Sequence, residues 1–333
     1  MRKILLLLFS FLVGIGLFIW IGKIVGWEEI KNSFLVFTGW YGVAIFLLTL
    51  LIMLISVWRW QEILKGSGSK ISIKELFAPY LAGFSVMFLA PILLWGGEIF
   101  RGYILKKNNS IPWPKGIASV IIDRILEWTT NLVVIFFGVL FFLLIIDFPP
   151  IKLGIVFGGV FLLFVGGIGY FYLKVFKKES MARTFFNIFG LKSLSQNNGI
   201  LDTEREIFDF FKLKKKALWK TFGLSFLRTG AMYARVWLLI IFLGKSVSAL
   251  SILSVLGFTY MAAMIPIPTA LGSHEAIQIF AFNSLGLGAS VATAFTMIIR
   301  GAELIVALAG AAILFKLGIT LLKNTLFENH NEI

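Results

Sequence analysis

Long apolar stretches separated by short polar segments dominate the chain. Six of them are close to 20 residues or longer, the length that a helix needs to cross a hydrocarbon core of roughly 30 Å. We interpret each as one full membrane crossing. They cover residues 4–22, 40–58, 117–146, 153–173, 218–243 and 289–315.

Two further apolar stretches, 76–105 and 249–287, are interrupted by glycine and proline. Each must begin and end on one side of the membrane if the basic loops are to share a side. We therefore expect two re-entrant hairpins or broken helices, because irregular backbone at membrane depth needs protein or a water-filled cavity around it. The alternative is that each stretch is an ordinary helix pair, which adds crossings.

Composition agrees with an all-α polytopic membrane protein. Of the 333 residues 59% are hydrophobic, 35 are Phe and 10 are Trp, and the mean hydropathy is +0.92. This apolar content exceeds what a soluble domain needs. We expect a single transmembrane domain over residues 1–333, with about six full spans and two hairpins.

The net charge of +14 is concentrated in loops. Eleven Lys and Arg residues fall within 174–220, four lie between Arg59 and Lys74, and three more are Lys106, Lys107 and Lys115. This is the positive-inside pattern. It predicts a multi-pass protein of a cytoplasmic (inner) membrane with both termini in the cytoplasm, and loops that contact anionic lipid headgroups rather than nucleic acid.

The segment 174–217 mixes basic and apolar residues, as in EREIFDFFKLKKK. This composition favours an amphipathic helix on the cytoplasmic leaflet. A solvated basic loop is the alternative.

Similar short sequence motifs recur in the two halves of the chain. PILLWGGE is followed by IIDRILEW in the first half, and PIPTALGSHE by IIRGAELI in the second. Glu98 and Glu275 are 177 positions apart, and Arg124 and Arg300 are 176 apart. Each of these arginines is followed three residues later by a glutamate, Glu127 or Glu303.

The offsets predict two repeats, 40–146 and 218–316. Equivalent positions of the two repeats are separated by three membrane crossings, and because this number is odd, the second repeat is inverted relative to the first. Inverted repeats with broken apolar segments at matching positions are typical of transporters. Chance recurrence of short apolar words is the alternative.

The apolar stretches carry five acids and five arginines, which cancel. Each costs about 2.5–3.5 kcal/mol at a helix centre, so we expect them to face the interior and form pairs. We interpret most of them as substrate-binding residues and a few as secondary; the alternative is that they are buried salt bridges that fix helix register. The substrate-binding set is Glu98, Arg101, Arg124, Glu127, Glu275, Arg300, Glu303 and His274, and the secondary set is Asp123, Arg228 and Arg235.

Particular roles follow from chemistry. Arg101 is expected to hold a lipid phosphate, and Glu98 to hold a cationic headgroup or to balance Arg101 in the empty site. Arg228 and Arg235 have the alternative of snorkelling to an interface. His274 is either a proton relay or ligand, or a polar residue at a helix start. Backbone hinges are expected at Gly96, Gly97, Pro266, Pro268 and Gly272.

The sequence gives no support for metal binding, cofactor binding or catalysis. The chain has two histidines, no cysteine and no carboxylate cluster at metal spacing, and it contains no nucleophile motif, phosphate loop or dinucleotide fingerprint. We expect no metal, no cofactor and no enzymatic activity.

The segments GGEIFR, ASVIIDRILEW and PIPTALGSHEA resemble the conserved blocks of the lysylphosphatidylglycerol synthase transmembrane family, also described as flippase-like membrane proteins. The resemblance covers nearly the whole chain. It implies lipid movement between leaflets in a stand-alone form, since no aminoacyl-transfer domain follows Ile333. By similarity the motif positions are Glu98, Arg101, Arg124, Pro266, Pro268, Gly272 and Glu275.

The chain departs from the family blocks at Trp95, Thr269, Ala270 and His274, which bears on headgroup specificity. The resulting prediction is a flippase or scramblase for an anionic or aminoacylated phospholipid or a polyprenyl-phosphate-linked lipid. A membrane-embedded lipid transferase and a non-transporting scaffold are the alternatives. Expected protein partners are a second copy of the chain or a lipid-synthesis enzyme.

Overall fold

The computed structural model describes residues 39–89, 96–146, 151–177, 179–188, 198–264 and 273–328, and these form helices and no strands. The all-helical prediction is confirmed for this part of the chain. The helices are α3 (Trp40–Gly66), α4 (Ile73–Leu89), α5 (Gly96–Asn109), α6 (Trp113–Ile145), α7 (Ile151–Lys177), α8 (Met181–Ile188), α10 (Asn198–Leu213), α11 (Lys215–Phe242), α12 (Ala249–Met264), α13 (Ser273–Ser284) and α14 (Ala289–Glu328).

Four of the described helices, α3, α6, α11 and α14, are long and apolar enough to cross a membrane. They coincide with four of the six predicted spans and are longer than the sequence pattern indicated. The predicted span 153–173 lies in α7, which has 27 residues. The span predicted at 4–22 lies outside the described residues.

Both glycine- and proline-interrupted stretches form pairs of short helices. α4 packs against α5, and α12 packs against α13. The interruptions themselves, residues 90–95 and 265–272, are outside the described part of the chain. Four helices in each half therefore follow in the same order, and the first residues of α3, α4, α5 and α6 precede those of α11, α12, α13 and α14 by 175 to 177 positions.

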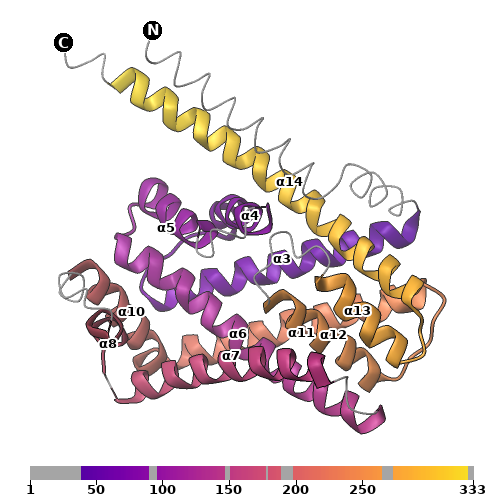
Figure 1. The fold of residues 1–333 in the computed structure, drawn as a ribbon. Coiled ribbons are helices and arrows are strands. Elements are labelled where there is room, and N and C mark those ends of the chain that lie inside the picture. The colour runs from indigo at the N-terminus through magenta and orange to yellow at the C-terminus, as the bar shows by residue number, and fades with distance from the viewer. Residues whose placement is uncertain are drawn as a thin grey trace.

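Packing exchanges partners between the two halves. α3 lies against α11, α6 lies against α12, and α4 lies against α14, which is the counterpart of α6. Figure 1 shows α3 and α11 side by side through the centre and α14 passing next to α4. Each half thus buries its helices mainly against the other.

Glycines allow the closest of these approaches. A methyl group at Gly257 of α12 would lie 3.2 Å from Cα of Gly138 on α6, and one at Gly310 of α14 would overlap the backbone oxygen of Leu81 on α4. Small residues of this kind let helices in membranes approach backbone to backbone, which strengthens van der Waals packing.

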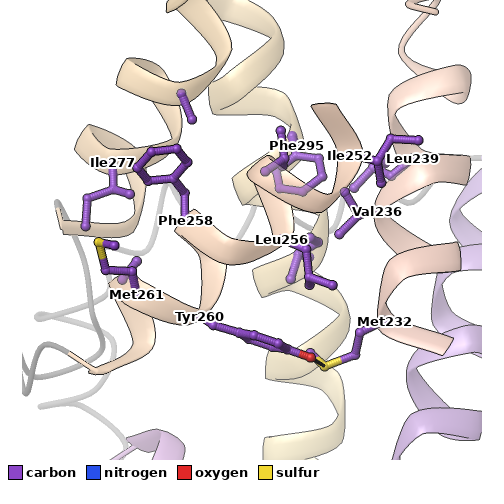
Figure 2. Packing of buried hydrophobic residues seen from close by; sticks show 14 of the residues in the cluster. Met232, Val236, Leu239, Ile252, Leu256, Phe258, Tyr260, Met261, Ile277 and Phe295 are labelled. Atoms are coloured by element: carbon purple, nitrogen blue, oxygen red, sulfur yellow. Dashed lines mark hydrogen bonds between the residues drawn. The ribbon is translucent and has the colours of Figure 1, made fainter. Parts of the chain in front are cut away.

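The largest buried cluster joins α11, α12, α13 and α14. In Figure 2 Met232 and Val236 face Leu256 and Ile252, and the hydroxyl of Tyr260 donates to the sulfur of Met232 at 3.0 Å. This core fixes the second hairpin against the long helices that carry the charged residues.

The segment 174–217 contains α8 and α10. The apolar residues Ile207, Phe210 and Phe211 of α10 are buried in one cluster with Ile122 of α6 and Phe171 of α7. The amphipathic face predicted for this segment is therefore used for packing against the bundle. Its expected position on the cytoplasmic leaflet stays a prediction.

Candidate functional site

Arg59 is the most deeply buried charge of the bundle, with no exposed side-chain surface. Its Nε donates to Asp123 at 2.7 Å, its Nη2 to Glu127 at 3.3 Å and its Nη1 to the hydroxyl of Ser225 at 3.3 Å. The prediction that Arg59 is one of the loop charges is wrong. α3 extends beyond the predicted end at residue 58, and the arginine lies inside the bundle.

Arg101 of α5 is held on the other side of Asp123. Both Nη atoms donate to the second oxygen of Asp123 at 3.1 Å. The guanidinium also lies 4.0 Å from the ring centroid of Trp60 and 4.6 Å from that of Tyr80. In this conformation Arg101 joins α3, α4, α5 and α6, so its expected contact with a lipid phosphate stays a prediction.

A second group of charges lies at the edge of the buried layer. Arg124 donates through Nε to Glu98 at 2.6 Å and through Nη1 to Glu127 at 3.0 Å. The side chains of Arg124 and Glu127 retain 12% and 11% exposure and that of Glu98 retains 7%, against 0–2% for Arg59, Asp123 and Arg101. Within the network around Asp123, these three side chains are therefore the more accessible ones.

Arg228 of α11 completes this group. Its Nη2 lies 2.9 Å from Glu127, and its Nε donates to the hydroxyl of Ser56 on α3 at 3.2 Å. Glu127 thus contacts three guanidinium groups, those of Arg59, Arg124 and Arg228. Arg59 and Arg124 also contact Asp123 and Glu98, so the network of four arginines and three acids carries one excess positive charge.

Arg235 of α11 makes a separate contact seven residues after Arg228. Its Nη1 donates to the hydroxyl of Thr49 on α3 at 3.1 Å, and its Nη2 donates to Glu303 on α14 at 3.1 Å. The side chain of Glu303 is 26% exposed, which makes this the more open of the two arginine sites.

The contacts of Arg59 and Arg235 are equivalent under the repeat offset. Arg235, Glu303 and Ser225 follow Arg59, Glu127 and Thr49 by 176 positions each. Each arginine binds the glutamate of its own half and the hydroxyl of the other half. The order of contacts is reversed along the two helices, so α3 and α11 run antiparallel.

Other predicted site residues are only partly described. Arg300 and His274 are half-buried on α14 and α13, whereas the side chain of Glu275 is outside the described part of the structure. Of the predicted hinges, Pro266, Pro268 and Gly272 lie in an interval that is not described, and Gly96 is the first residue of α5. Gly97 packs so closely on α4 that a methyl group there would overlap the carbonyl oxygen of Gly83.

The described side chains of the network offer charges and hydrogen-bonding groups. No group of three or more His, Asp or Glu in the described ranges is arranged to hold a metal ion. Among those residues the Oε2 of Glu98, the Nη1 of Arg228 and the Nε atoms of Arg101 and Arg235 are buried without a hydrogen-bond partner. Such atoms are suited to a polar ligand, since an unpaired buried group costs about 1–3 kcal/mol.

Four residues of this site were not predicted from the sequence: Arg59, Thr49, Ser56 and Ser225. One signal was available, because subtracting the 176-residue offset from Arg235 and Ser225 gives Arg59 and Thr49. Ser56 carries no such signal, because its equivalent position is Met232.

The sequence matches one known protein family. The model of the lysylphosphatidylglycerol synthase transmembrane region matches residues 7–310. The chain belongs to this family. Among its relatives is a UPF0104 membrane protein of Methanocaldococcus jannaschii, 27% identical over 90% of this chain and 90% of the relative. Another, from Pyrococcus horikoshii, is 29% identical over 76% of this chain and 81% of the relative.

A third UPF0104 membrane protein, from Methanothermobacter thermautotrophicus, is 24% identical over 83% of this chain and 85% of its own length. No solved structure matches the chain. The family match covers most of the chain, and the protein is a multi-pass membrane protein.

Proposed function

We propose that the protein is a lipid transporter rather than an enzyme, and that it moves an anionic lipid between the leaflets of a cytoplasmic membrane. The reciprocal contacts of Arg59 and Arg235 on antiparallel helices carry this proposal. Equivalent helices that run in opposite directions and pack on each other are what two inverted repeats produce. In transporters built this way the substrate site lies at the repeat interface.

Two gates follow from the positions of these contacts along α3. Thr49 and Arg59 are ten residues apart, which corresponds to about 15 Å along a helix. The contact of Arg59 with Ser225 and that of Arg235 with Thr49 thus lie at different depths. If one contact opens while the other holds, the site is accessible from one leaflet at a time. The group formed by Glu98, Arg124, Glu127 and Arg228 lies within the charged region that the two contacts flank.

The interior charge favours an anionic headgroup. The described network contains four arginines and three acids, so it carries one excess positive charge. A headgroup would enter between the hairpins α4–α5 and α12–α13 while its acyl chains stay in the lipid. Membrane lipids are accordingly the proposed partners.

The test is leaflet-to-leaflet movement of fluorescent phosphatidylglycerol in proteoliposomes, followed by bleaching with an impermeant reductant. Protein-free vesicles should lose about half of the signal, because only the outer leaflet is accessible, and vesicles with the protein should lose more. Equal loss in both would contradict transport. A new lipid product found by mass spectrometry of the same vesicles would instead identify a transferase.

A further inference from the structure

Three charged residues of the interior have no charged equivalent in the other half. Arg59 and Glu127 correspond to Arg235 and Glu303 in both sequence and contacts. In the sequence Arg124 corresponds to Arg300, and Glu98 to Glu275. These four arginines and four glutamates are therefore balanced between the repeats.

Two features break the symmetry. The first is the pair of Arg101 and Asp123, whose equivalent positions are Gln278 and Ile299; it is neutral and adds no net charge. The second is Arg228, whose equivalent position is Ile52. Of six interior arginines and five interior acids in the sequence, Arg228 is thus the one that supplies the excess charge.

The surroundings of Arg228 leave part of its guanidinium available. Nη2 is bound to Glu127, and Nε to Ser56, but Nη1 is buried and has no hydrogen-bond partner among the described residues. The side chain of Arg228 as a whole is 12% exposed, so the residue lies at the edge of the network with Nη1 just inside it.

We propose that Arg228, together with Arg124 on the opposite side of Glu127, binds the phosphate of the transported lipid. That this lipid is transported rests on the proposed function. The binding of the lipid to Arg228 and Arg124 can be measured separately from transport. A single excess positive charge is neutralised by a singly charged phosphodiester. A zwitterionic lipid leaves its own cation next to an electropositive site, and a doubly charged phosphomonoester leaves one negative charge buried, which is costly in a low-dielectric interior.

Arginine suits this role because its planar fork continues to hold Glu127 while Nη1 donates to a phosphate oxygen. Loss of Arg228 does not leave Glu127 unpaired, since Arg59 and Arg124 remain in contact with it. A variant at this position should therefore fold.

The test is equilibrium binding of dioctanoyl phosphatidylglycerol to the purified full chain in detergent, measured by native mass spectrometry. Arg228→Gln should weaken binding about tenfold or more, the effect expected for one charge-assisted hydrogen bond. Arg228→Lys should fall between Arg228→Gln and the wild type, because the charge remains and the fork is lost. Arg183→Gln is the matched control, since it removes the same charge from an exposed position on α8.

The wild-type protein should bind dioctanoyl phosphatidylglycerol more tightly than dioctanoyl phosphatidylcholine or dioctanoyl phosphatidic acid. Equal affinity of Arg228→Gln and the wild type, or an equal loss in Arg183→Gln, would overturn the assignment. Displacement of phosphatidylglycerol by millimolar inorganic phosphate would show that the site recognises free phosphate and would overturn the choice of a lipid. Arg228-dependent binding without any lipid movement in vesicles would refute the transport function and leave the binding site in place.

Discussion

Arg59 and Arg235 occupy equivalent positions on antiparallel helices, but their acidic partners differ in exposure. Asp123, which binds Arg59, is 1% exposed, whereas Glu303, which binds Arg235, is 26% exposed. The extra pair of Arg101 and Asp123 accounts for this difference, because it adds α5 to the contacts of the first site. The first site is thus closed and the second is more accessible in this conformation.

This difference predicts unequal effects of removing the two arginines. Arg59→Met leaves Asp123 with one partner in a fully buried site, and we expect a loss of about 3–5 kcal/mol in the free energy of unfolding. Arg235→Met leaves Glu303 partly solvated, so its cost should be smaller. Thermal unfolding in detergent measures both. A larger loss for Arg235→Met would contradict the assignment of the closed site.

Exchange of Arg300 and Glu303 tests which residues form pairs. The two are three residues apart on α14, but Glu303 binds Arg235 on α11. We therefore expect the double variant Arg300→Glu with Glu303→Arg to recover little of the stability lost in either single variant, because it places two arginines together. Full recovery of the melting temperature would show that the pair is local to α14.

The close approach of α4 and α14 makes a second prediction about stability. Gly310→Ala places a methyl group against the backbone of Leu81, which should separate the helices and lower the melting temperature. Gly223→Ala on α11 is the control, because no atom lies within 4 Å of its added methyl group. That variant should be neutral or stabilising by up to about 1 kcal/mol from helix propensity. Equal melting temperatures would mean that the helices separate without cost.

The orientation of the loops can be tested directly because the chain has no cysteine. Single cysteines at Asn198 and Ser246, both exposed, should react with an impermeant thiol reagent from opposite sides of the membrane. We expect Asn198→Cys to be protected in intact cells and Ser246→Cys to be labelled. Labelling of both from one side would refute the inverted repeat.

Glu98 should influence transport more than folding. Its Oε1 binds Arg124 at 2.6 Å, while its Oε2 has no partner among the described residues. Glu98→Gln keeps the shape and removes the charge, so we expect a changed preference between headgroups in the vesicle assay with a nearly unchanged melting temperature. Wild-type rates for every headgroup from a well-folded variant would assign Glu98 a structural role alone.

The sequence alone determined the class of the protein and the outline of its repeat. Length and apolarity decide which segments can cross a membrane, because the thickness of the hydrocarbon core is fixed. The offsets between Glu98 and Glu275 and between Arg124 and Arg300 also located the four-helix units, since the first residues of equivalent helices keep the same spacing. These are local properties that do not depend on packing.

Only the tertiary structure decided which charges meet. Hydropathy ended the predicted span just before Arg59 and placed this residue in a loop, because an average over neighbours cannot distinguish an arginine in water from one bound to Asp123. The pairing of Arg228 with Ser56, and that of Arg235 with Thr49, joins residues more than 170 positions apart. Such contacts depend on the antiparallel packing of α3 and α11, in which a buried charge is stabilised by whichever group the neighbouring helix brings to it.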